Sequence, residues 1–353
     1  MRLLGLLFLF KFSTNLFALE NLTSHDQIEF FSRTMGEGIV LETKKDAYYI
    51  LDDHIGFKYT PDKILYERVL HNGKIIQENH YTINSQGLRK THFQKDHAKE
   101  EVLMVGGSFL FGVGVSDENT LTSILSKVDP LRNYYNWGRV GFGPSNIIGI
   151  FKYELANLKI TKPIQIVYMR LRYHYERSWP TLTWHRSMPF SIDYDWDEKT
   201  NQLKELGPMF GPNKTRLAKI YDWLGERWLV QKFNLDYPNF LIAKMIKKEC
   251  AFINEMNRLA KQMKAKFSVV DHPLFYLKDE NYIKRYDEVF EGCLDSSIPL
   301  FSFKGLRVPD KESFNKFVVL PDIDTHPNAQ FNQLLANEMM KTLFKNSAIK
   351  IEN

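Results

Sequence analysis

Cysteine is scarce in this chain of 353 residues, which has only Cys250 and Cys293 and no CxxC pair. There is also no Cys/His cluster with metal-ligand spacing, so structural zinc is not expected. The two cysteines lie far apart in the sequence, which leaves open whether they form one disulfide or remain two buried thiols. Internal repeats and low-complexity tracts are absent as well. The sequence therefore predicts one large domain with insertions, or one domain with a small second one.

Long blocks of one charge are also missing, and the net charge of +5 is spread along the chain. Short basic clusters such as Lys244, Lys247 and Lys248 fit the solvated face of a helix better than a nucleic-acid site. No nucleic-acid partner is therefore expected. A hydrophobic content of 44% with 25% charged residues is ordinary for a globular protein and excludes a disordered chain.

Long hydrophobic runs are lacking except at the start, where an apolar stretch extends from Leu3 to Phe10 and Ala18 precedes a polar continuation. This pattern predicts a signal peptide over residues 1–18 and an exported protein, periplasmic or secreted. Lys11 interrupts the apolar region, and Leu16 is large for a position three residues before a cleavage site. An uncleaved membrane anchor is therefore the alternative.

Residues 19–98 are predicted to form a strand-rich N-terminal region, in which Asn72-Gly73 between two strand-like runs indicates a hairpin. From residue 99 to about 345, strand-like runs alternate with helical patterns. One of these helices follows "SDENT", with Ser116 or Asp117 as its expected cap. Such alternation predicts an α/β fold with a parallel sheet and helices on both faces.

The alternation breaks at about residues 178–240, and we interpret this stretch as an aromatic-rich insertion. Within it, "SIDYDWDEKTNQLKEL" resembles a hairpin. The tryptophans of this segment either stack on sugar rings or simply pack the insertion onto the domain. They are Trp179, Trp184, Trp196, Trp223 and Trp228.

One predicted strand ends unusually, because residues 102–115 read "VLMVGGSFLFGVGV". In a parallel sheet the functional site lies at the carboxyl ends of the strands, which is where Ser108 falls. Ser108 is thus either a turn residue or a nucleophile.

A partner for such a nucleophile lies near the other end of the chain, in "DIDTHPN". In an extended segment, residues two apart point to the same side, so Asp324 can reach one nitrogen of His326. Pro327 keeps His326 out of helical conformations. A carboxylate behind an imidazole that faces a serine is the arrangement that activates a hydroxyl. The structural alternative is a polar cap before a final helix, with Asn328 as a turn residue.

These stretches together resemble the SGNH (GDSL-type) hydrolase superfamily. "VGGSFLFGVGVSDENTLTSIL", "YNWGRVGFGPSN" and "DIDTHPNAQFNQLLANEM" stand in the family's order, and the resemblance covers about residues 99–345. It implies a flavodoxin-like parallel sheet, with Ser108 as nucleophile, His326 as base and Asp324 as its acid. It also implies that the backbone amides of Ser108 and Gly141 form the oxyanion hole.

The sequence departs from the family pattern in two places. The first motif reads GGS where GDS is usual, and the third block, normally G-x-N-D, is missing. "VYMRLRYHYERS" stands in its place, with His174 and Arg177 near the expected position. The asparagine of that block normally donates to the oxyanion. His174 is predicted to replace it, since an imidazole N–H can donate in the same way. The alternative is that His174 and Arg177 only anchor the insertion.

The resemblance implies a serine esterase that removes acetyl or short acyl groups from a cell-envelope carbohydrate or a small ester, with no metal and no organic cofactor. Two alternatives remain open. One is an O-acetyltransferase that passes the acyl group to a glycan and would work with a membrane-bound acyl-transfer partner. The other is a glycan-binding or scaffold protein that has lost catalysis.

Overall fold

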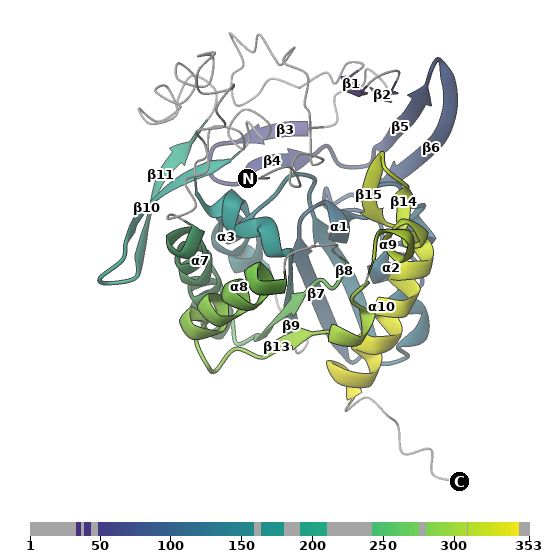
Figure 1. The fold of residues 1–353 in the computed structure, drawn as a ribbon. Coiled ribbons are helices and arrows are strands. Elements are labelled where there is room, and N and C mark those ends of the chain that lie inside the picture. The colour runs from purple at the N-terminus through teal and green to yellow at the C-terminus, as the bar shows by residue number, and fades with distance from the viewer. Residues whose placement is uncertain are drawn as a thin grey trace, which may run out of the picture.

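The computed structural model of the chain describes residues 33–36, 39–43, 49–158, 164–179, 191–209, 242–274, 280–308 and 310–345 (Figure 1). The predicted signal peptide lies outside these residues, as do Trp184, Trp223 and Trp228.

A five-stranded parallel sheet forms the centre of the molecule. Its strands stand in the order β8, β7, β9, β12, β13. Numbered along the chain, this order is 2-1-3-4-5, which is that of flavodoxin-like folds. In such folds the second strand lies on one side of the first, and the later strands are added on its other side. The predicted fold class is confirmed. The strands are β7 (Glu100–Gly106), β8 (Arg132–Gly138), β9 (Ile164–Arg170), β12 (Lys266–Asp271) and β13 (Leu300–Ser302).

Helices cover both faces of the sheet, as the alternating pattern predicted (Figure 1). Alternate strand residues point to opposite faces. Thus Leu103 and Val105 of β7 belong to one hydrophobic cluster, with α3 (Pro144–Gly149), α7 (Ile242–Gln262) and α8 (Glu280–Cys293). Val102 and Met104 belong to a second cluster, with α2 (Leu121–Val128) and α10 (Ala329–Thr342). The described residues also form the α-helices α1 (Ser108–Phe111) and α9 (Lys311–Lys316).

Shorter helical turns follow several of these elements. They are η1 (Asp117–Asn119), η2 (Ile150–Glu154, a π-helix), η3 (Leu155–Asn157), η4 (Arg172–Ser178) and η6 (Lys304–Leu306). Of these, η4 begins directly beyond the carboxyl end of β9. Because β9 and β7 are parallel neighbours, η4 lies at the same end of the sheet as the start of α1.

The N-terminal region is rich in strands, as predicted. A four-stranded sheet has the order β1, β2, β5, β6, and β3 pairs with β4. Asn72 and Gly73, both with positive φ, form the tight turn between β5 and β6 that the sequence indicated. The strands are β1 (Arg33–Gly36), β2 (Ile39–Thr43), β3 (Tyr49–Asp52), β4 (Gly56–Tyr59), β5 (Ile64–His71) and β6 (Lys74–Thr82).

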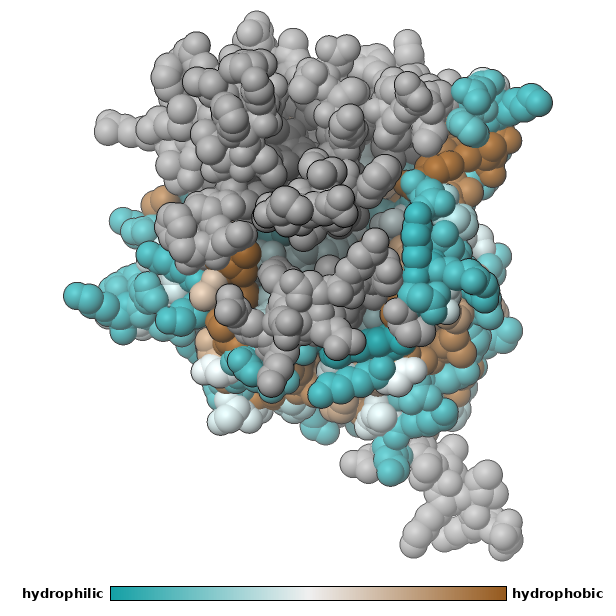
Figure 2. All heavy atoms as spheres, in the orientation of Figure 1, coloured by the Kyte–Doolittle hydropathy of each residue, from teal (hydrophilic) through white to brown (hydrophobic). Residues whose placement is uncertain are grey.

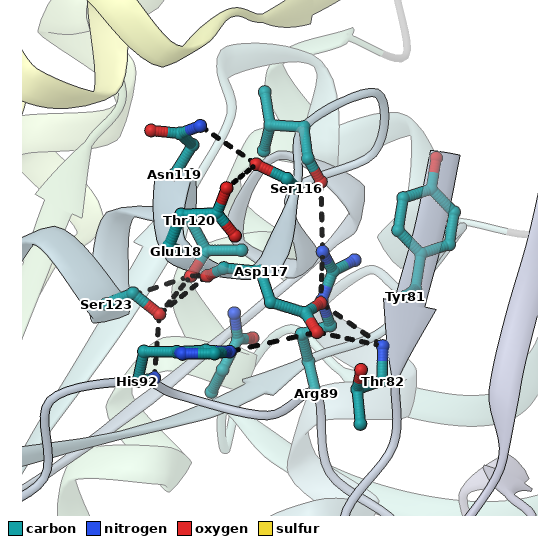
Figure 3. Close-up of polar contacts among 12 residues, drawn as sticks. Tyr81, Thr82, Arg89, His92, Ser116, Asp117, Glu118, Asn119, Thr120 and Ser123 are labelled. Carbon is teal, nitrogen blue, oxygen red and sulfur yellow. Dashed lines mark hydrogen bonds and ion pairs between the residues drawn. The ribbon is translucent and has the colours of Figure 1, made fainter. Parts of the chain in front are cut away.

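A buried ion pair attaches this region to the segment that follows α1 (Figure 3). The fully buried Arg89 contacts a carboxylate oxygen of Asp117 at 2.8 Å and donates to the carbonyl of Val115 at 2.9 Å. The backbone N–H of Thr82 donates to the same carboxylate at 3.1 Å. Breaking such a pair from one side would leave an uncompensated buried charge, so the contact holds the two regions together.

The helix cap expected at Ser116 or Asp117 is wrong. Ser116 precedes the short turn η1 and Asp117 begins it, whereas α2 starts only at Leu121, with Thr120 as its cap. The hydroxyl oxygen of Thr120 accepts from the backbone N–H of Ser123 at 3.3 Å. Asp117 is not available for capping because its carboxylate is committed to Arg89.

Part of the predicted insertion lies within the described residues, and there the hairpin expected from the sequence is present. It consists of β10 (Ile192–Asp197) and β11 (Gln202–Pro208), which pair antiparallel. A disulfide joins Cys250 of α7 to Cys293 of α8, which decides the question that the sequence left open.

The surface over the β5–β6 hairpin is partly hydrophobic, at the upper right of the view in Figure 2. Its exposed apolar residues are Ile64, Ile75 and Ile76. Among the helices of the described residues, none has the length and apolar character needed to span a bilayer.

Candidate active site

The turn between β7 and α1 presents Ser108 at the carboxyl end of β7, the strand next to the edge strand β8. Gly107 precedes the helix, and Ser108 is its first residue, with only 5% of its surface exposed. A side chain at Gly107 would place its Cβ 3.0 Å from the carbonyl oxygen of Phe142 and 3.5 Å from Nε2 of His174. A side chain at this position would therefore be tightly confined, because other segments pack directly against this turn.

The next two glycines of the motif shape the loop after α1. Gly112 ends the helix in the left-handed conformation with φ of 83°, and its N–H donates to the carbonyl of Ser108. Gly114 also has positive φ, and a Cβ there would lie 2.6 Å from the side chain of Val319. Val319 belongs to β14 (Val318–Leu320), which pairs with β15 (Asp324–Pro327). The close approach at Gly114 thus brings the hairpin that carries Asp324 and His326 against the Ser108 loop.

Asp324 and His326 interact as the D-x-H spacing predicted. Nδ1 of His326 lies 2.5 Å from Oδ1 of Asp324, and the backbone N–H of His326 donates to the same oxygen at 3.0 Å. Burial raises the pKa of Asp324, but the charge and hydrogen bonds of His326 outweigh it and the net pKa is lowered. An ionised carboxylate only accepts hydrogen bonds, so Nδ1 carries the proton and Nε2 of His326 remains the basic nitrogen.

The final helix does begin with a polar cap at Asn328, whose side-chain oxygen accepts from the N–H of Phe331 at 3.0 Å. The alternative hypothesis expected a polar cap before the final helix, and Asn328 is that cap. Asp324 and His326 bond to each other instead.

Phe109, the residue after Ser108, contacts His326. The rings of Phe109 and His326 lie 5.1 Å apart, and α1 packs against β15. Within the described part of the chain no hydrogen bond joins the Ser108 hydroxyl to His326. Nucleophile and base commonly draw together only when substrate is bound.

His174 lies on η4, beyond the end of β9, the strand next to β7. It is fully buried, and its Nδ1 accepts from the backbone N–H of Leu171 at 3.3 Å and lies 3.0 Å from the hydroxyl of Tyr168. Burial, followed by the charge of Arg177, holds the pKa of His174 well below its usual value. The imidazole is therefore neutral and carries its proton on Nε2, the nitrogen that faces Gly107.

Gly141 lies in the loop between β8 and α3, in the left-handed conformation with φ of 80°. The N–H of Arg139 in this loop donates to the carbonyl of Gly106 at 3.1 Å, and the carbonyl of Phe142 reaches Gly107. This loop and η4 both pack against the turn that presents Ser108. The structure thus brings Ser108, Gly141 and His174 to the carboxyl ends of the strands, together with His326 and Asp324.

Two further residues of this region were missed. His272 follows β12, is buried, and its ring lies 5.1 Å from that of Phe109. Its position directly after a buried strand was the signal that could have found it. Glu67 of β5 accepts from the hydroxyl of Tyr81 at 2.5 Å. Burial raises the pKa of Glu67, and the neighbouring charge of Asp324 raises it further. No sequence pattern connects Glu67 with Asp324.

Metal ligands and cavities add little to this site. Among the described residues, no group of three or more His, Cys, Asp or Glu side chains is arranged to hold a metal ion. A cavity of about 450 Å³ lies between the N-terminal region and the edge strand β8, lined in part by Leu88, Arg89 and Tyr135. None of the predicted site residues lines this cavity.

Comparison with known proteins gives matches only among solved structures. No family model matches the sequence, and no curated protein matches it significantly. A member of the lipolytic protein G-D-S-L family from Veillonella parvula is 13% identical, with a TM-score of 0.36 over 70% of this chain and 99% of that one. Est24, a carbohydrate acetylesterase from Sinorhizobium meliloti, is 13% identical, with a TM-score of 0.35 over 70% and 100%. Est2A, an acetyl xylan esterase from Butyrivibrio proteoclasticus, is 11% identical, with a TM-score of 0.30 over 79% and 69%.

Proposed function

We propose that this chain is a serine-dependent acyl-ester hydrolase of the SGNH type that removes acetyl or short acyl groups from a cell-envelope carbohydrate. The observation that carries the proposal is the Asp324–His326 pair, at 2.5 Å, packed against the helix that begins with Ser108. That helix starts at the carboxyl end of β7, the first strand of a sheet with flavodoxin-like order, and such folds place their sites at the carboxyl ends of the strands.

The proposed reaction has two stages. The hydroxyl of Ser108 attacks the ester carbonyl carbon while Nε2 of His326 takes the hydroxyl proton, and the carbonyl π electrons move onto oxygen. Collapse of the tetrahedral intermediate breaks the bond to the alcohol, which leaves with the proton from His326. Water then attacks the carbonyl carbon of the acyl-enzyme while Nε2 of His326 takes its proton. The bond to the Ser108 oxygen breaks, the acid leaves, and His326 returns the proton to that oxygen. Asp324 keeps the proton on Nδ1 throughout and stabilises the imidazolium that forms.

The oxyanion of each intermediate is bound, in this proposal, by the backbone amides of Ser108 and Gly141 and by Nε2–H of His174. The neutral state and tautomer of His174 support its role, because they present a donor toward Gly107. A side-chain donor at this position would replace the asparagine of the missing third block. It therefore favours an active enzyme over a protein that has lost catalysis. Such donors are worth roughly 10²–10³ in rate.

The test is hydrolysis of a short aryl acetate by Ser108→Ala. We expect kcat to fall at least about 10³-fold, because removal of a triad nucleophile leaves only binding and oxyanion contributions. Wild-type protein should also form a one-to-one adduct with a fluorophosphonate probe on Ser108. Ser85→Ala, an exposed serine remote from the site, serves as the control and should keep full activity and labelling.

Turnover retained in Ser108→Ala would assign the nucleophile elsewhere. A wild-type protein that neither turns over nor labels would support the catalytically degenerate alternative. Product analysis with and without a glycan acceptor separates hydrolysis from acyl transfer.

A further inference from the structure

Two N–H donors converge on the turn that presents Ser108. A Cβ at Gly107 would lie 3.3 Å from Nη1 of Arg177 and 3.5 Å from Nε2 of His174, and these two nitrogens are 3.4 Å apart. Because Nδ1 of His174 accepts from the N–H of Leu171, Nε2 carries a proton. In this tautomer the contact joins two donors, whereas with the proton on Nδ1 it is a hydrogen bond from Arg177 to Nε2 of His174. A negatively charged oxygen is the acceptor that suits both.

Arg177 is held in this position from several sides. Nη1 donates to the carbonyl of Phe142 at 2.8 Å, and the carbonyl of Arg177 accepts from the hydroxyl of Ser145 at 3.3 Å. Its side-chain carbons occupy the space beside Gly143, where a Cβ would lie 2.2 Å away. The guanidinium also lies 5.1 Å from the ring of Tyr173. The residue is buried, with 8% of its surface exposed.

A fixed, buried positive charge beside a nucleophile stabilises negative charge that develops there. It acts strongly because little water screens it and because no reorganisation is needed during the reaction. The guanidinium keeps its proton at all relevant pH values, so its contribution does not depend on titration.

We propose that Arg177 is a catalytic residue that donates to the oxyanion together with His174, so that a histidine and an arginine do the work of the missing asparagine. This inference rests on the proposed function. When the bond from Ser108 to the carbonyl carbon forms, the negative charge on the carbonyl oxygen is shared between Nη1–H of Arg177 and Nε2–H of His174. No proton leaves Arg177, and the oxygen regains its double bond when the alcohol departs.

The experiment compares Arg177→Gln with Arg172→Gln, using a short aryl acetate. Arg172 lies on the same turn η4, but its guanidinium pairs with Asp271 and Asp287 rather than with the Ser108 turn. We expect Arg177→Gln to lower kcat about 10²-fold with KM changed less than threefold, since the lost contact forms only in the transition state. Arg172→Gln should lower the melting temperature but leave kcat within about twofold of wild type.

Two further measurements distinguish a role of the Arg177 positive charge from a purely structural role of this side chain. Millimolar methylguanidinium should restore activity to Arg177→Ala but not to Ser108→Ala. A phenylboronic acid, which forms an anionic adduct with serine, should lose affinity for Arg177→Gln by a factor similar to the loss in kcat/KM. Arg177→Gln with wild-type kcat, or with a changed KM and melting temperature only, would overturn the proposal. Failure of the proposed function would differ, because wild-type protein itself would then be inert and unlabelled.

Discussion

At the scale of single residues, the site depends on a histidine whose chemistry is set by its neighbours. Burial and the charge of Arg177 keep His174 neutral, and the N–H of Leu171 fixes which nitrogen carries the proton. An exposed histidine would exchange between both tautomers and the imidazolium. The environment of His174 therefore makes it a fixed donor of one hydrogen bond, which is the property that an amide side chain would have there.

This assignment predicts the behaviour of two variants at position 174. His174→Ala should lower kcat for an aryl acetate at least tenfold with little change in KM, because the donor acts on the transition state. His174→Gln places an amide N–H near the position of Nε2 and should lie closer to wild type. Steady-state kinetics of both variants are the measurement. If kcat holds in His174→Ala and only stability or KM suffers, His174 is structural.

At the scale of elements, the site is formed where loops from several strand ends and a hairpin meet. The segment after β12 contributes His272, whose ring lies between Phe109 of α1 and Phe331 of α10, at centroid distances of 5.1 and 5.5 Å. Burial lowers the pKa of His272 to about 3 from its ordinary value of 6.5. The packing of two helices against this strand end thus requires the neutral ring.

This contact predicts a loss of stability in acid. Below about pH 6.5 the unfolded chain binds a proton at His272 that the folded protein does not bind until about pH 3, so stability falls as pH falls through this window. At pH 4.5 the penalty is on the order of 2–3 kcal/mol. His272→Gln should therefore lose less unfolding free energy than wild type between pH 7.5 and 4.5 in denaturant titrations. Equal losses in both proteins would contradict the prediction.

At the scale of the whole molecule, one buried ion pair and one disulfide link segments that are distant in the chain. Arg89 and Asp117 join the N-terminal region to the loop after α1, and Cys250–Cys293 joins α7 to α8. Disulfides persist mainly in oxidising compartments. Together with the apolar start of the chain, the disulfide supports our proposal that the protein is exported.

Export predicts a mature chain that begins near Leu19 and contains no free thiol. N-terminal sequencing of protein from its native source, with thiol alkylation before and after reduction, measures both. Alkylation should label two cysteines only after reduction. Intact protein that starts at Met1 and is recovered from the cytosol with both thiols free would refute export.

Much of the fold and part of the site follow from local sequence patterns. The turn at Asn72-Gly73, the strand that stops at Gly106 and the pairing of Asp324 with His326 depend on residues close in the chain, so spacing alone predicts them. The alternation of strands and helices predicted the parallel sheet for the same reason. The burial of Ser108 at this turn, by contrast, results from segments that arrive from elsewhere.

The sequence by itself therefore determined the sheet, its order of elements and the D-x-H pair, because backbone periodicity and turn chemistry are local. Only the tertiary structure decided that Asp117 pairs with Arg89 and leaves capping to Thr120, and that Cys250 reaches Cys293. It also decided that Arg177 and His174 converge on Gly107. Those contacts join segments distant in the chain, and the packing of β8, β9 and their loops around the Ser108 turn sets the distances between them.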